Sequence, residues 1–208
     1  MKAETPPDLN ASIISLGACQ LLARGAFRDC FAHPNDERLC VKVAHGVRAG
    51  RRGYEDPNIR EMVEYERLKK LGAPVHRYGP EIYGVIATDL GPGLCVERLR
   101  GVGGGPVPNI RTACRNRIAE GHPIDDILAG VRELAGFCVE FQVLAVCAGP
   151  ENIGIVQRHG TEQIVAFDFK GHRNKEFFPI SSYIPYFRRR KVARRFERMT
   201  AYLEGLGP

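Results

Sequence analysis

The sequence has 208 residues, of which 44% are hydrophobic and 26% are charged. These proportions are ordinary for a globular protein, so they exclude wholesale disorder and a fibrous repeat. The length allows one domain or one compact two-lobed domain. The formal net charge of +6 would indicate an anionic partner if it were spread evenly, but much of it lies in one segment near the C-terminus.

The sequence predicts neither a membrane span nor a secreted, disulfide-bonded protein. Its longest apolar runs, such as residues 138–149, are interrupted by Glu140 and Gln142 and are shorter than the roughly 20 residues that a membrane helix needs. The N-terminal residues show no apolar core of a signal peptide, so the bacterial cytoplasm is the expected location. The seven cysteines lack a C-x-x-C pair and the six histidines lack a ligand cluster, which indicates reduced core thiols and no metal held by these residue types.

Short strands are predicted for the first part of the chain. Apolar segments bounded by turn residues indicate strands over residues 13–16, 20–23, 30–32 and 38–44. The next residues, 45–53, are basic and contain three glycines. This composition predicts a surface loop rather than a helix or a strand.

A helix is predicted between Asp56 and Gly72. Asp56 is a suitable N-cap, Pro57 suits the first helical position, and the glycine is a suitable end. The three- and four-residue steps of a helix place three residues on one side, namely Glu61, Tyr65 and Leu68.

A strand pair and a glycine run complete the first half. Strands are predicted over residues 82–88 and 94–99, joined by a turn at residues 89–93 that contains two glycines and a proline. The glycine run at residues 101–105 is the candidate hinge between two lobes, because few contacts cross such linkers.

The second half is predicted to be mainly helical. Apolar residues recur at helical spacing from Ile124 to Phe141, and Asp125 and Asp126 are placed to interact well with the helix dipole. The remaining predicted elements are two strands and an amphipathic terminal helix, at residues 153–157, 163–167 and 188–206.

Residues 22–31 and 39–43, taken together, resemble the start of a protein kinase. In that family a glycine-rich hairpin covers the phosphates of ATP, and a strand lysine pairs these phosphates with a helix glutamate. Gly25 matches the second glycine of the hairpin, whereas Arg28 replaces the third; an ordinary turn is the alternative reading of Gly25 alone. Lys42 is the stronger signal, because a lysine between apolar strand residues needs an anion to offset its desolvation.

The anion opposite Lys42 would be a bound phosphate or a helix glutamate. Glu61 matches the family spacing, with bulky residues four and seven positions later, and Glu64 matches it nearly as well. If neither pairs with the lysine, both are solvated helix residues. Gly25, Lys42 and Glu61 are therefore the predicted nucleotide-binding residues.

Asn152 and Asp168 resemble the metal-binding residues of the kinase catalytic region. Asn152 precedes one predicted strand, and Asp168 follows the strand predicted to pair with it. An amide oxygen and a carboxylate at the same end of two paired strands would form a hard oxygen site for Mg²⁺ on nucleotide phosphates. The alternative is that Asp168 simply ends a strand.

The chain also departs from the kinase pattern. Counting back from Asn152, Cys147 stands in the place of the catalytic aspartate and Gly149 in that of the accompanying lysine. A thiol without a nearby cation is a poor base. About forty residues follow Asp168, too few for the substrate-binding helices of a true kinase.

Among kinase-like families, the chain resembles the short bacterial YrbL proteins, the PhoP regulatory network proteins. The similarity lies in residues 25–34, the strand around Lys42, the helix at Arg60 and Glu61, and the pair Asn152 and Asp168. It covers most of the chain. The resemblance implies a kinase-like fold and a role in a bacterial regulatory response, and it does not imply a particular reaction.

The terminal helix is unusually basic. Its cations could bind nucleic acid or an anionic membrane surface. The opposite side is an apolar stripe, so a packed helix with a solvated basic face is the favoured interpretation, also because no aromatics are interleaved for base stacking. The cations are Arg188, Arg189, Arg190, Lys191, Arg194, Arg195 and Arg198.

The sequence thus predicts an α+β protein with a two-lobed, protein-kinase-like fold. An antiparallel N-terminal sheet plus one helix would form the lobe of residues 1–100. A hinge at residues 101–106 would lead to a shortened, mainly helical C-terminal lobe at residues 107–208.

Three functions remain open. The first is a pseudokinase-like regulatory protein that binds a nucleotide, expected to be ATP with Mg²⁺, and signals through a regulatory protein partner. The second is an active atypical kinase that phosphorylates a small molecule or a protein. The third is nucleic-acid binding through the basic terminal helix. Cys147 and the short second half favour the first over the second, and the lack of stacking aromatics disfavours the third.

Overall fold

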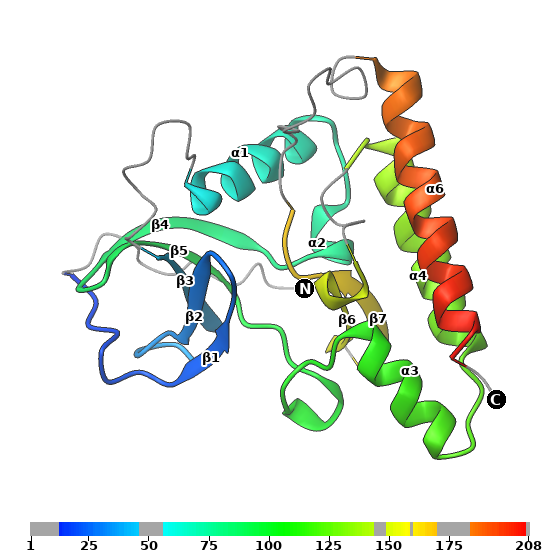
Figure 1. Ribbon diagram of the computed structural model, residues 1–208. Coiled ribbons are helices and arrows are strands. Elements are labelled where there is room, and N and C mark those ends of the chain that lie inside the picture. The colour runs from blue at the N-terminus through cyan, green and yellow to red at the C-terminus, as the bar shows by residue number, and fades with distance from the viewer. Residues whose placement is uncertain (1–12, 46–55, 144–148, 159, 170–183, 207–208) are drawn as a thin grey trace. The chain divides into compact units, whose positions relative to one another are not determined.

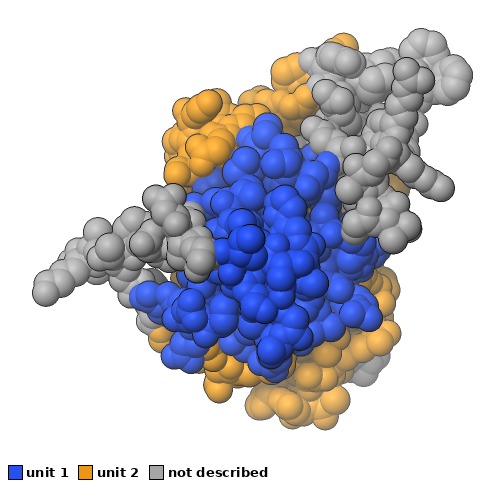
Figure 2. Space-filling model, turned by 90° about the vertical axis from the view of Figure 1, so that its left-hand side faces the viewer, with its two compact units in different colours: residues 1–65, 80–98 blue, residues 66–79, 99–208 orange. Residues whose placement is uncertain are grey.

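The computed structural model describes residues 13–45, 56–143, 149–158, 160–169 and 184–206 (Figure 1). The chain divides into two compact units (Figure 2). Unit 1 comprises residues 1–65 and 80–98, and unit 2 comprises residues 66–79 and 99–208. The predicted hinge and lobe boundaries stay predictions.

A five-stranded antiparallel sheet forms the body of unit 1 (Figure 1). The strands occur in the order β1-β2-β3-β5-β4, so β3 is central. Their bounds are Leu21–Arg24 (β1), Arg28–Ala32 (β2), Leu39–Ala44 (β3), Ile82–Thr88 (β4) and Gly91–Glu97 (β5). The predicted antiparallel N-terminal sheet is confirmed.

Side chains from β3 and β5 fill the two faces of this sheet. Apolar residues alternate between the faces because successive strand residues point in opposite directions. One face buries Leu16, Val41 and Ile86. The other buries Cys40, Leu94 and Val96, with Met62 of the following helix packed against them.

The predicted helix after Asp56 is confirmed as α1, Pro57–Lys70. The Asp56 carboxylate accepts a hydrogen bond from the backbone N–H of Asn58 at 2.8 Å, as an N-cap should. After the helix, Gly72 adopts a φ of 71°, a conformation that favours glycine. The residues predicted to share one side, Glu61, Tyr65 and Leu68, are all buried.

Two predictions about unit 1 were wrong in detail. Residues 13–16 do not form a strand, because Ile14 makes only an isolated bridge with Thr88. The segment is held instead by the Asp89 carboxylate, which accepts hydrogen bonds from the backbone N–H groups of Leu16 and Gly17. The turn before β5 is also tighter than predicted, since β5 begins at Gly91.

The described part of unit 2 consists mainly of helices and a β-hairpin. The hairpin and the two long helices were predicted, whereas α2 and α3 were not. The elements are α2 (Val75–Tyr78), η2 (Val102–Gly104), α3 (Ile110–Ala119), α4 (Asp125–Glu140), η4 (Pro150–Asn152), β6 (Ile153–Arg158), β7 (Thr161–Ala166) and α6 (Pro185–Glu204).

The helices α4 and α6 lie side by side (Figure 1). The apolar stripe predicted for α6 is buried at Val192, Phe196, Met199 and Leu203. An aromatic cluster lies beside α4, where Phe137 stacks on Tyr78 with ring centroids 4.5 Å apart. Within the described ranges no helix is both long enough and apolar enough to cross a membrane.

Candidate functional site

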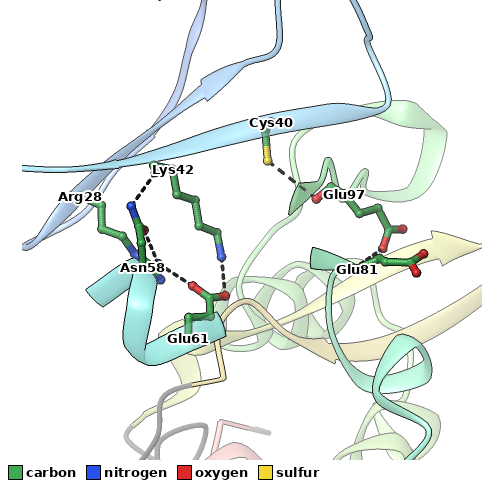
Figure 3. A network of polar contacts seen from close by, with 7 residues as sticks. All are labelled: Arg28, Cys40, Lys42, Asn58, Glu61, Glu81 and Glu97. Carbon is green, nitrogen blue, oxygen red and sulfur yellow. Dashed lines mark hydrogen bonds and ion pairs between the residues drawn. The ribbon is translucent and has the colours of Figure 1, made fainter. Parts of the chain in front are cut away.

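A buried ion pair joins the central strand to α1. The Lys42 Nζ atom of β3 lies 2.8 Å from the Glu61 Oε1 atom of α1 (Figure 3). The Glu61 side chain is 0% exposed and that of Lys42 is 12% exposed. The structure thus brings together two of the three residues predicted to bind nucleotide, whose binding role stays a prediction.

A second cation contacts the same carboxylate. The Arg28 Nη1 atom lies 2.5 Å from the Glu61 Oε2 atom, and the Arg28 side chain is only 10% exposed. Arg28 is the residue that replaces the third glycine of the kinase hairpin. Sequence reasoning treated it as a loss, although Arg28, Cys30 and Lys42 share one face of the sheet through the pairing of β2 with β3.

Asn58 completes the network from the first turn of α1. Its side-chain oxygen accepts a hydrogen bond from the Arg28 guanidinium at 3.0 Å, and its amide group donates to the backbone oxygen of Lys42 at 2.9 Å (Figure 3). Asn58 was not predicted as a site residue. It ties the start of α1 to both β2 and β3.

The network explains how a charged carboxylate is tolerated in the interior. Burying an ionised group is costly unless it is paired and hydrogen-bonded. Glu61 has a cation at each of its two oxygens. The three charged side chains therefore hold one another in place, and they hold Lys42 in a fixed position on the sheet face.

Gly25 lies in the turn between β1 and β2. Its backbone N–H donates to the Arg28 oxygen at 2.9 Å, and an added Cβ would lie 3.0 Å from the same oxygen. The turn is braced by Asp29, whose carboxylate contacts His45 at 3.1 Å and Arg24 at 3.2 Å. The hydrogen bond from His45, with help from Arg24, lowers the pKa of Asp29. The hairpin is thus a braced turn.

The β6/β7 hairpin of unit 2 brings Asn152 and Asp168 to the same end. Ile153 pairs with Ala166 at the last registered position, and the backbone N–H of Phe167 donates to the Asn152 oxygen at 2.9 Å. Both predicted metal ligands lie directly beyond this pairing and are half-buried. The predicted proximity agrees with the register, while the metal-binding role stays a prediction.

The donor types of Asn152 and Asp168 fit Mg²⁺. An amide oxygen and a carboxylate are hard ligands, and Mg²⁺ in nucleotide sites takes one or two carboxylates and completes its shell with phosphate and water. In the described part of the chain, no group of three or more His, Cys, Asp or Glu side chains gathers to hold a metal alone.

Local contacts fix the turn that carries Asn152. The turn η4 begins after Gly149, whose oxygen accepts from the Asn152 N–H at 3.2 Å. Arg111 of α3 contacts the Glu151 carboxylate at 2.5 Å. In β6, a Cβ on Gly154 would lie 2.4 Å from the Phe167 ring, so this position of the strand can pack only with a glycine.

Cys147, in the place of the catalytic aspartate, lies outside the described residues.

The comparisons with known proteins concern the family and the fold. A family model described as PhoP regulatory network protein YrbL matches residues 14–204. A comparison with curated proteins finds no significant match.

Among solved structures, the chain is similar to the kinase domain of PknI from Mycobacterium tuberculosis, in crystals of two double mutants. The first has a TM-score of 0.57 at 16% identity, over 91% of this chain and 72% of that chain. The second has a TM-score of 0.56 at 15% identity, over 91% and 74%. At such identity the similarity establishes the fold, and the predicted protein-kinase-like fold is confirmed.

Proposed function

Because the chain belongs to the YrbL family of PhoP regulatory network proteins and has a protein-kinase-like fold, we propose that it is a kinase-like regulatory protein that binds a nucleotide together with Mg²⁺. We further propose that it transfers phosphate poorly or not at all and acts through a protein partner. The nucleotide, the metal and the partner are parts of this proposal.

The observation that carries the proposal is the buried network around Glu61. A lysine on the central strand, fixed by a fully buried glutamate, is the arrangement that kinases use to hold ATP phosphates. An ammonium group in such a position attracts an anionic ligand. The network supports an anion-binding role for Lys42, with Glu61 as its positioning residue.

Asn152 and Asp168 would hold the metal in this proposal. Mg²⁺ neutralises the negative charge of nucleotide phosphates when it is bound. The two side chains would orient it from one end of the β6/β7 hairpin, just beyond the pair of Ile153 with Ala166. The turn bonds at Gly149 and Phe167 would keep Asn152 in place.

The pseudokinase part rests on two residue identities. Counting back from Asn152, Cys147 stands where a kinase has its catalytic aspartate, and Gly149 stands where a kinase has a lysine. General-base help contributes roughly 10²- to 10⁴-fold to rate. A chain without that base is therefore expected to bind nucleotide without turning it over efficiently.

The first prediction is that Mg²⁺-ATP stabilises the wild-type protein against heat. Ligand at a hundredfold excess over its dissociation constant adds about 2.7 kcal/mol by mass action. Lys42→Ala and Asp168→Ala should each abolish the shift in thermal unfolding. Lys69→Ala is the matched control, because it removes a lysine from an exposed position of α1 and should keep the shift. No shift of the wild type at millimolar ATP would contradict the proposal.

A specific observation keeps nucleic-acid binding as a second candidate. Tyr186 and Phe187, at the start of α6, are 63% and 44% exposed, beside the exposed Arg189 and Arg190. Exposed aromatics near cations suit base stacking. If nucleic acid binds there, the affinity should fall steeply with salt, by about 0.9 in the log-log slope per phosphate neutralised. A weak complex without that slope would remove the candidate.

A further inference from the structure

Two thiols lie on the sheet face that carries Lys42. In the pairing of β2 with β3, Cys30 is directly opposite Lys42, and Cys40 is opposite Ala32. Side chains two residues apart on a strand point to the same face. Cys30, Cys40 and Lys42 therefore share one face, with the two cysteines as diagonal neighbours.

The two thiols differ in their surroundings. Cys40 is buried and packs with Leu94 and Val96, whereas Cys30 is half-buried and packs against this cluster. The Cys40 thiol donates to the Glu97 backbone oxygen at 3.7 Å (Figure 3). Cys30 is thus the thiol that a small reagent can reach, and Cys40 is the buried thiol beside it.

The charges around Cys30 favour its thiolate. The adjacent Cys40 thiol lowers the pKa of Cys30, and the positive charges of Lys42 and Arg28 lower it further, against the opposing effects of burial and Glu61. The adjacent Cys30 sulfur, together with burial, raises the pKa of Cys40. Cys30 is the more exposed of the two thiols and lies directly opposite Lys42, so we expect it to ionise first.

Other described thiols lack this setting. Burial raises the pKa of Cys95 to about 11 and also raises the pKa of Cys114. Cys19 is half-buried like Cys30, but its sulfur donates to the backbone oxygen of Ser15 at 3.4 Å. Among the cysteines that the structure describes, Cys30 combines access, a neighbouring thiol and an opposing lysine.

We propose that Cys30 is a nucleophilic thiol that small hydroperoxides oxidise, and that its oxidation weakens anion binding at Lys42. The Cys30 thiolate attacks one peroxide oxygen, so that an S–O bond forms and the O–O bond breaks. The second oxygen leaves as an alkoxide or hydroxide and takes up a proton, which gives a sulfenic acid and an alcohol or water. The sulfur loses two electrons and the peroxide gains them.

The weakening of anion binding at Lys42 rests on the proposed function, whereas the oxidation of Cys30 does not. Oxidation adds a polar oxygen to the side chain directly across from Lys42. Lys42 is held by Glu61 on this same face. A bound anion would have to share that face with the oxidised sulfur.

The test treats the full-length protein with limiting hydrogen peroxide in the presence of dimedone, a trap for sulfenic acids, and locates the label by peptide mass mapping. Cys30 should be labelled first. Cys19 is the matched control, because it is similarly exposed. Equal labelling of Cys19 and Cys30, or labelling elsewhere with Cys30 unmodified, overturns the proposal. A disulfide of Cys30 with Cys40 also supports it, because Cys40 then displaces water from the oxidised Cys30.

Two variants test the part played by the neighbouring thiol. Cys30→Ser should remove the fast-reacting site. Cys40→Ala should slow the labelling of Cys30, about tenfold for each unit by which the pKa of Cys30 rises. Unchanged labelling of Cys30 in the Cys40→Ala variant contradicts the role given to Cys40. If either variant fails to fold, the wild-type pH profile serves instead, since the labelling rate of Cys30 should rise at a lower pH than that of an ordinary thiol. A profile with an ordinary thiol pKa contradicts the proposal.

A last measurement separates the two proposals. The thermal shift with Mg²⁺-ATP is recorded before and after oxidation, and again after reduction by dithiothreitol. A reduced protein that shows no shift overturns the proposed function and the second half of this proposal, while the labelling result for Cys30 stands on its own. A shift that oxidation leaves unchanged overturns the second half alone.

Discussion

Glu61 is fully buried between Arg28 and Lys42, so the stability of the protein should depend on these two cations jointly. Removing one cation leaves the carboxylate with the other. Removing both leaves a buried charge without its ion-pair partners, which is strongly destabilising, by about 3–5 kcal/mol for a broken buried pair. Arg28→Ala and Lys42→Ala should therefore be non-additive.

This prediction is measured with a double-mutant cycle in urea unfolding. The double variant should lose more free energy of unfolding than the sum of the two single variants, by about 0.5–3 kcal/mol. The control is the same cycle in a Glu61→Gln background, where the carboxylate is gone and the coupling should disappear. Additive single substitutions in the wild-type background would show that Arg28 does not compensate for Lys42.

Sequence reasoning found part of this network, for a physical reason. Lys42 and Glu61 follow from local patterns, namely a lysine inside an apolar strand and a glutamate at a fixed helix spacing. Arg28 and Asn58 interact across 30 positions of the chain. Their roles depend on the register between β2 and β3 and on where α1 docks, which a single sequence does not specify.

At the scale of the element, α4 contains two glycines with opposite expected behaviour. A Cβ on Gly130 would lie 2.4 Å from the Ile164 side chain of β7, whereas nothing lies within 4 Å of a Cβ on Gly136. Gly136→Ala should stabilise the helix by up to about 1 kcal/mol through helix propensity. Gly130→Ala should instead destabilise the protein by about 1–3 kcal/mol, because overpacking outweighs that gain.

Thermal or urea unfolding of both variants checks this prediction, and each serves as the control for the other. Stabilisation by both substitutions would mean that α4 and β7 separate without cost. Destabilisation by both would mean that the helix, and not its contact with Ile164, sets the effect.

The long helices were predictable and the short ones were not. In α4 and α6 the apolar stripe extends over several turns, so its period is clear. The missed α3 is short and carries three arginines. Its signal was present nonetheless, because Asn109 caps it by accepting from the Thr112 N–H at 3.0 Å, and Ile110, Ala113 and Cys114 follow the three- and four-residue steps.

At the scale of the whole molecule, the sequence predicted the fold because its kinase-like signals occur in order along nearly the entire chain. A glycine turn, a strand lysine, a helix glutamate and the Asn152 and Asp168 pair each agree with the pattern. The family match covers residues 14–204, and the structural similarity covers 91% of the chain.

The prediction about phosphate transfer also concerns the whole chain, and it is tested at Cys147. Cys147→Ser should leave Mg²⁺-ATP binding and any residual phosphate transfer nearly unchanged, because the thiol is proposed to do no chemistry. Cys147→Asp should raise transfer only modestly, since Gly149 supplies no lysine. Incubation with labelled ATP measures both variants. Wild-type turnover at ordinary kinase rates of about 1–100 per second, lost in Cys147→Ser, would refute the pseudokinase proposal.

The buried network around Glu61 also constrains the order of events during folding. The carboxylate of α1 meets its two cations, one on β2 and one on β3, on a face that strand pairing assembles. We therefore expect α1 to dock late, after the folding barrier. Damage to the network should act chiefly on the unfolding rate, with φ-values near zero, so that the network governs how long the native state lasts more than how quickly it forms.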